Sequence, residues 1–146
     1  MKTACFLCAA SFALIVTAAE AGPNARGYDL GPVWDIASVQ TKDGHFNDYL
    51  KFVVTKWKAQ EEALKKAGII LDYKVYVTID PRDNEPDIAL ATEYKDFSKF
   101  DVPLDQQEAM AKKLSGSVAA ADKEQAGRGD IRILRGDTLV RELKFQ

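Results

Sequence analysis

The sequence predicts an α+β domain in which a four-stranded antiparallel sheet carries its helices on one face. Three observations in the 146-residue chain predict it. An alternating segment is followed by a long apolar stripe at helical spacing, two further alternating segments flank a turn rich in Pro and Asn, and a helical region precedes a last alternating segment. We find no internal repeat, so one domain is expected.

Residues 1–21 have the pattern of a cleaved secretory signal peptide. Lys2 precedes an apolar run over residues 4–18, and the small-residue exit places cleavage after Ala19 or after Ala21. The run of about 15 residues is shorter than the roughly 20 that span a bilayer, so no membrane anchor is expected after processing. We therefore expect an exported protein, either periplasmic or secreted.

Cysteine positions and charge exclude several classes of site and partner. Both cysteines, Cys5 and Cys8, lie in the signal peptide, so the mature chain has no disulfide and no thiolate metal site. The net charge is −2, and acidic and basic residues are interspersed. Nucleic acid and anionic membranes are therefore not expected partners.

The domain is predicted over residues 32–146, after a flexible leader at residues 22–31 that contains Gly, Pro and Asn. The first strand is expected over residues 33–40. Its alternation places two sets of side chains on opposite faces, with Val33, Asp35, Ala37 and Val39 on one and Trp34, Ile36, Ser38 and Gln40 on the other.

The clearest helix follows the Lys42-Asp43-Gly44 break. Apolar residues recur at three- and four-residue spacing from Phe46 to Ala67, and Gly68 ends the helix. The Lys and Glu residues between them predict a solvated face, with Glu61–Lys65 and Glu62–Lys66 as i, i+4 pairs worth about 0.3 kcal/mol each.

The rest of the chain predicts a hairpin, a helical region and a closing strand. Strands over residues 69–79 and 87–94 flank the polar turn at residues 80–86. The helical signal between residues 95 and 129 is interrupted at Ser115-Gly116-Ser117. Residues 131–145 form either a last strand pair or one strand with a kink. This order is the split β-α-β arrangement of ferredoxin-like domains, and it leaves one sheet face uncovered, for which a partner subunit is the usual remedy.

Several joints between these elements carry a resemblance to a known superfamily. They are Lys42-Asp43-Gly44 with the helix start His45–Leu50, the joint Lys65–Ile70, the hairpin end Glu93-Tyr94, and the segment Asp96–Asp101. Over roughly residues 33–145 the chain resembles the dimeric α/β barrel superfamily, which includes antibiotic-biosynthesis monooxygenase, NIPSNAP and EthD-like groups. The resemblance implies a homodimer with face-to-face sheets and a pocket between sheet and helices or inside the barrel.

The same resemblance carries no catalytic role to this chain. Active members use a small set of Asn, Trp and His, and Asn47, Trp34, Trp57 and His45 do not match that set position by position. The single histidine, at a helix start, is expected to face solvent. One His without Cys excludes the common zinc patterns and leaves only a carboxylate-rich metal site open. No metal and no other cofactor is predicted.

Asp35 is the weak candidate for catalysis because a carboxylate in a central strand is costly to bury unless it is paired or protonated. Its alternative role is structural, with Arg132 of the last strand as its ion-pair partner. Tyr76 shares a strand face with Lys74 and Asp72. The predicted ligand-binding residues are Trp34, Asp35, Tyr76 and Tyr94.

The function predicted first is an exported, homodimeric domain that binds a small, partly apolar molecule. One alternative is a cofactor-independent monooxygenase or isomerase that acts on a small cyclic substrate with Asp35 as proton acceptor. Another is a structural component of an envelope assembly. The sequence favours none of these enough to decide whether the protein is an enzyme.

Overall fold

The computed structural model describes residues 26–146. The expected signal peptide, both cysteines and the first residues of the expected leader lie outside the described residues. Within residues 26–146 no helix is long and apolar enough to cross a membrane.

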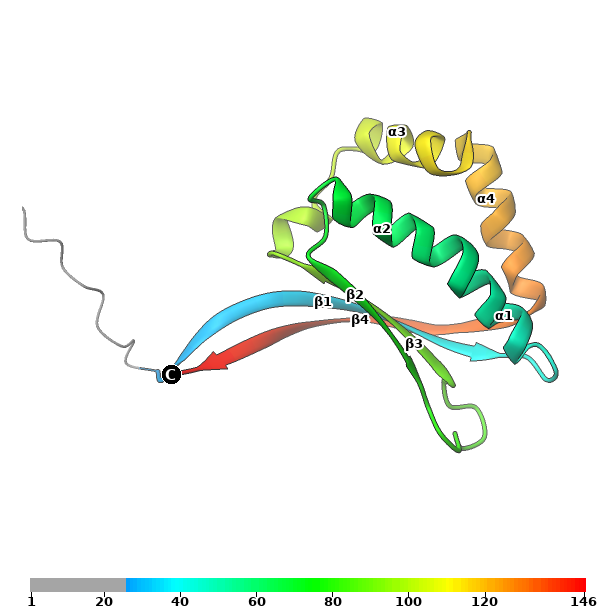
Figure 1. Cartoon of the computed structure of the whole chain (residues 1–146), viewed down its shortest axis with the longest axis horizontal. Helices are drawn as coiled ribbons and strands as arrows, with labels where there is room; N and C mark the ends of the chain where they lie inside the picture. The colour runs from blue at the N-terminus through cyan, green and yellow to red at the C-terminus, as the bar shows by residue number, and fades with distance from the viewer. Residues whose placement is uncertain (1–25) are drawn as a thin grey trace, which may run out of the picture.

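The described chain contains four strands, several α-helices and three short η helices, of which η1 is a π-helix and η2 and η3 are 3₁₀ turns (Figure 1). In chain order they are β1 (Tyr28–Thr41), α1 (Phe46–Phe52), η1 (Val53–Trp57), α2 (Lys58–Lys66), β2 (Asp72–Val77), β3 (Ile88–Tyr94), η2 (Phe97–Phe100), α3 (Leu104–Ser115), α4 (Val118–Gly127), η3 (Arg128–Asp130) and β4 (Arg132–Phe145).

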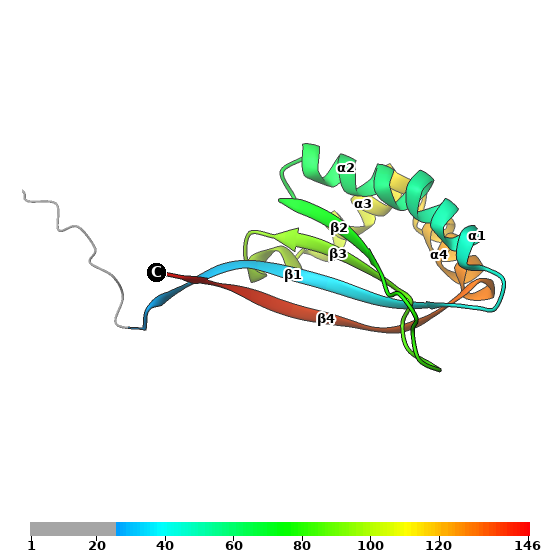
Figure 2. The ribbon, with the colours of Figure 1, turned by 60° about the horizontal axis from the view of Figure 1, so that its bottom comes forward.

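The four strands form one antiparallel sheet in the order β2-β3-β1-β4. This is the ferredoxin-like order, in which the first and third strands are central. The helices lie on one face of the sheet (Figure 2). The predicted α+β class and the predicted uncovered face are therefore confirmed.

The strand-forming part of the chain begins earlier than Pro32. Tyr28 pairs with Phe145 and Leu30 pairs with Leu143, so residues 28–31 belong to β1 rather than to a leader. These pairs form a ribbon of β1 and β4 that extends away from the helices (Figure 1). Cross-strand pairing, which the local sequence does not reveal, accounts for the difference.

The closing segment is one strand with an irregularity. Ser38 pairs with Gly136 and Val39 with Leu134, so Arg135 has no opposite residue and forms a bulge. Gly136 has φ of 131°, which a residue with a Cβ rarely adopts. Of the two forms that the sequence left open, the structure has the kinked strand.

The helical region before β4 breaks where the sequence predicts. Gly116 ends α3 with φ of 83°, and the Ser117 hydroxyl then accepts a hydrogen bond from the Ala120 N–H at 3.0 Å as the N-cap of α4. The long helix is continuous from Phe46 to Lys66, with the π-helical turn η1 between α1 and α2.

The core lies between the long helix and the two central strands. Its buried residues are Val39, Tyr49, Val53, Ile88 and Leu90. In contrast, α3 and α4 contain no buried residue. The second helical layer is therefore peripheral, and it leaves space between itself, the long helix and the sheet.

The ion pairs predicted along the long helix do not form. Lys65 instead pairs with Asp72 at 2.7 Å, and the Tyr73 hydroxyl donates to Glu62 at 2.5 Å. Glu61, predicted on the solvated face, is only 7% exposed. Glu61 therefore faces the sheet, and not the solvent as the sequence predicts.

A candidate ligand site between the sheet and the long helix

The structure does not bring the four predicted ligand-binding residues into one pocket. Asp35 pairs with Thr92 and Val33 with Tyr94, and this row of residues faces the helices together with the core residue Val39. Because side chains alternate along a strand, Trp34 faces the opposite, open side of the sheet.

Tyr76 lies on the open face with Trp34. It pairs with Ala89, which in turn pairs with Ser38 on the Trp34 side of β1. Tyr76 is 52% exposed, and the Lys74 ammonium lies 4.8 Å from the centre of the Trp34 ring. The predicted set therefore divides into Asp35 and Tyr94 under the helices, and Trp34 and Tyr76 outside.

Asp35 forms no ion pair with any of the described residues. Arg132 pairs in register with Thr41 at the far end of β1, whereas the β4 residue opposite Asp35 is Leu139. The suggested Asp35–Arg132 pair is therefore wrong. Burial, and next the charge of Asp137, raise the pKa of Asp35, and no group of residues 26–146 hydrogen-bonds to its buried Oδ1 atom.

Glu61 is a second carboxyl group that faces the same part of the sheet, and the sequence reasoning missed it. The Thr92 hydroxyl donates to its Oε2 at 3.2 Å. Burial raises the pKa of Glu61 to about 7; the Thr92 hydrogen bond opposes this shift, and the charge of Asp35 adds to it. The sequence does contain one sign that Glu61 is buried: it lies four residues after Trp57, and therefore on the apolar stripe of the helix.

Tyr94 completes this group of interacting side chains. Burial raises its pKa to about 12, with smaller contributions from the charges of Glu61 and Asp35. We call Asp35, Glu61, Thr92 and Tyr94 the acid cluster. It supplies hydrogen-bond donors and acceptors in a partly desolvated environment, and one of its carboxyl groups titrates near neutrality.

The Tyr94 side of the acid cluster borders a cavity of about 510 Å³. This Tyr94 cavity lies between the end of α2, η2 and the start of α3. Its lining is mainly apolar, with Leu64, Ile69, Phe100, Val102 and Met110, and its polar residues are Tyr94, Lys99, Gln106 and Gln107. Tyr94 and Phe100 are in ring contact, with centroids 4.7 Å apart. The volume is within the range of small-molecule sites.

A smaller cavity of about 240 Å³ lies toward the other end of the long helix. This Trp57 cavity is bordered by Ala37 and Leu90, which follow Asp35 and precede Thr92 on the same sheet face, and by Gln60, next to Glu61. Two arginines, Arg128 and Arg132, also border it. The acid cluster thus lies between two cavities of different chemistry.

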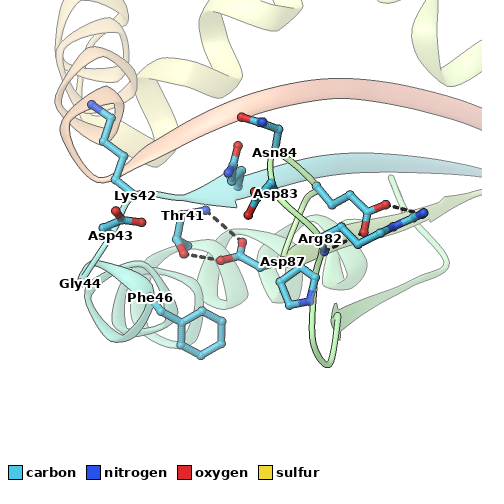
Figure 3. A pocket seen from close by; sticks show the side chains of 12 residues that line it. Thr41, Lys42, Asp43, Gly44, Phe46, Arg82, Asp83, Asn84 and Asp87 are labelled. Carbon is cyan, nitrogen blue, oxygen red and sulfur yellow. Dashed lines mark hydrogen bonds and ion pairs between the residues drawn. The ribbon is translucent and has the colours of Figure 1, made fainter.

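A third cavity, of about 310 Å³, lies among loops at the end of the sheet (Figure 3). Asp87 points toward Thr41 and accepts hydrogen bonds from its backbone N–H at 3.0 Å and from its hydroxyl group. Arg82 pairs with Glu85 across the adjacent turn. These contacts tie the end of β1 to the β2–β3 loop, so this cavity belongs to a structural junction.

Replacing Thr41 by Val is expected to lower the free energy of unfolding by about 1–2 kcal/mol, because a hydrogen bond to a charged carboxylate is lost at constant shape. Denaturant unfolding measures this. Thr78→Val, an exposed change beside the same loop, is the control and should be close to neutral. Equal effects of the two substitutions would contradict the assigned role of Thr41.

His45 lies directly before α1, where its Nδ1 is 2.9 Å from an Asp48 carboxylate oxygen. Across residues 26–146 no group of three His, Cys, Asp or Glu side chains is arranged to hold a metal ion.

Comparison with known proteins supports the fold. No protein-family model matches the chain, and no curated protein matches it. Among solved structures, HapK from Hahella chejuensis aligns with a TM-score of 0.52 at 9% identity, over 75% of this chain and 91% of that one. A dimeric protein of unknown function with a ferredoxin-like fold from Bacteroides fragilis aligns with a TM-score of 0.42 at 17% identity, over 79% and 97% of the two chains. At 9% identity, the HapK alignment supports the α+β ferredoxin-like fold alone.

Proposed function

We propose that this chain is an exported, homodimeric domain that binds a small, partly apolar molecule in the Tyr94 cavity. One observation carries the proposal: an apolar cavity of about 510 Å³ is bordered by a tyrosine that belongs to a buried acid cluster. Apolar walls supply affinity, and a few convergent polar groups orient the ligand.

The expected ligand has an apolar ring and one polar group. Leu64, Val102 and Met110 provide the apolar wall on the helix side. The Tyr94 hydroxyl group can donate or accept a hydrogen bond, and with a pKa of about 12 it is neutral at physiological pH. A hydroxyl or carbonyl group on the ligand would therefore form a hydrogen bond with Tyr94, which a pure hydrocarbon cannot form.

The open sheet face supports a second copy of the chain as partner. It carries Trp34, Ile36 and Tyr76, with Ala89 and Ala91 between them, and no helix of the described chain covers it (Figure 2). A twofold interface needs a surface that is complementary to itself, and small residues at the centre of the open face let a second copy approach closely. The resemblance to dimeric α/β barrels implies the same arrangement.

One observation favours an enzyme as the second candidate. Glu61 has a pKa of about 7, which suits a general acid–base group at neutral pH. In this alternative Glu61, rather than Asp35, accepts a proton from a cyclic substrate. Burial, with a smaller contribution from the Asp35 charge, keeps the Glu61 pKa high. Glu61→Gln would then abolish turnover in an isomerase assay, whereas unchanged turnover would end this alternative.

The ligand-binding proposal predicts that 2-naphthol raises the melting temperature of the protein more than naphthalene does, because only the alcohol hydrogen-bonds to Tyr94. Tyr94→Phe should reduce the two effects to the same size. Val102→Trp should abolish both by filling the cavity. Tyr76→Phe, a tyrosine outside the cavity, is the matched control and should behave as the unsubstituted protein. Full binding to the Val102→Trp variant would place the ligand elsewhere and overturn the proposal.

A further inference from the structure

Two cationic side chains border the Trp57 cavity without an acidic partner in the described chain. Arg128 lies in η3 and Arg132 at the start of β4. Among residues 26–146 neither guanidinium forms an ion pair with a carboxylate. Both donate a hydrogen bond to the same neutral acceptor, the side-chain oxygen of Gln125.

Arg132 is the stronger sign that the cavity suits an anion. It is only 8% exposed, and its buried Nε has no hydrogen-bond acceptor among the described residues. A buried charge normally has a charged or hydrogen-bonding partner, because leaving it unpaired costs several kcal/mol. Arg128 adds a second charge nearby, and burial together with the charge of Arg132 lowers the pKa of Arg128.

Aromatic rings hold both guanidinium groups in place. Arg128 lies 4.6 Å from the centre of the Phe52 ring, and Arg132 lies 5.6 Å from that of Tyr49. A guanidinium close to the face of an aromatic ring is attracted by the ring and can still donate its N–H groups to an anion. Both guanidinium groups thus have ring contacts and a contact with Gln125 that fix their positions near the cavity.

The remaining lining limits what the anion can be. Trp57 borders the cavity and is fixed by an edge contact with Tyr73, with ring centroids 5.5 Å apart. The volume of about 240 Å³ suits one ring with a small substituent. Asp137 also borders the cavity, and its carboxylate opposes anion binding. The two arginines and this aspartate leave a net charge of +1, which favours a monocarboxylate over a dianion.

We propose that Arg128 and Arg132 form an anion-binding site for a small aromatic monocarboxylate, whose carboxylate binds the two guanidinium groups and whose ring packs against Trp57. The site is separate from the Tyr94 cavity, because the acid cluster lies between them. It therefore does not depend on the function proposed for that cavity.

Trp57 fluorescence in a Trp34→Phe background tests the site, because the chain has two tryptophans and Trp34 lies on the open face. Sodium benzoate is expected to change the Trp57 emission with saturation, and benzamide, its uncharged isostere, to bind about tenfold more weakly or worse. Arg128→Gln should weaken benzoate binding by a similar factor and leave the benzamide affinity unchanged.

Two control variants distinguish binding at this site from binding elsewhere on the protein. Arg135→Gln removes a guanidinium that binds Gln40 outside the cavity, and it should leave benzoate affinity unchanged. Val102→Phe, which adds bulk to the Tyr94 cavity without adding a tryptophan, should also leave it unchanged. Equal affinities for benzoate and benzamide, or benzoate binding that survives Arg128→Gln, would overturn the proposal. Loss of benzoate binding in Val102→Phe would place the probe in the Tyr94 cavity and would also overturn the proposal.

Discussion

Replacing Glu61 by Gln is expected to stabilise the protein at pH 8 by about 3 kcal/mol and to leave its stability near pH 4 almost unchanged. The reason is that the folded protein holds this carboxyl group in a buried site, where its pKa is about 7 against an ordinary value of 4.5. Gln keeps the shape of the side chain and can still accept the hydrogen bond from Thr92.

The direction of this effect follows from proton linkage. Between pH 4.5 and about 7 Glu61 is protonated in the folded chain and ionised in the unfolded chain. The folded state then binds more protons, so the free energy of unfolding falls as the pH rises and levels off above about 7. A shift of this size corresponds to about 3 kcal/mol at 1.36 kcal/mol per pH unit.

Denaturant unfolding at a series of pH values measures the effect. The unsubstituted protein should lose stability from pH 4.5 to 7, and Glu61→Gln should lose less over that interval. Glu62→Gln changes the adjacent, exposed glutamate and should retain the original pH dependence. If Glu61→Gln changed the stability equally at every pH, the carboxyl group would titrate alike in the folded and the unfolded chain, which would contradict the raised pKa of Glu61.

Local sequence patterns were sufficient for the fold. Alternation located three of the strands, the helical stripe located the long helix, and Gly116 marked the break between α3 and α4. Their order then determined the topology, because a split β-α-β chain has few antiparallel arrangements. The additional length of β1 was not predictable, since it depends on pairing with β4 more than a hundred residues away.

The candidate site was predicted less well, for reasons that differ between residues. Trp34 and Asp35 are neighbours in one strand, so alternation alone already separates them. The position of Arg132 depends on the β1–β4 register and its bulge, which no local pattern encodes. Glu61 was assigned to the solvated face by its charge, although its spacing from Trp57 placed it on the buried one. For Glu61, helical spacing predicts the buried position better than the charge of the side chain does.

A charged side chain at Ala89 is expected to convert the proposed homodimer into a monomer. Ala89 lies at the middle of the open face, between Ser38 of β1 and Tyr76 of β2 in the register. In a face-to-face dimer, Ala89→Arg would bury two additional guanidinium groups without acidic partners. The cost is several kcal/mol for each ion, which is comparable with the whole association free energy of a micromolar dimer.

Analytical ultracentrifugation of the mature chain measures this change. The unsubstituted protein should sediment as a dimer at micromolar concentration and Ala89→Arg as a folded monomer, because the side chain points away from the core. Ala119→Arg, an exposed alanine on α4, controls for the added charge and should remain dimeric. A monomeric unsubstituted protein would contradict the homodimer and leave the ligand proposal for the Tyr94 cavity intact, since that cavity lies on the helix side of the sheet and not on the open face.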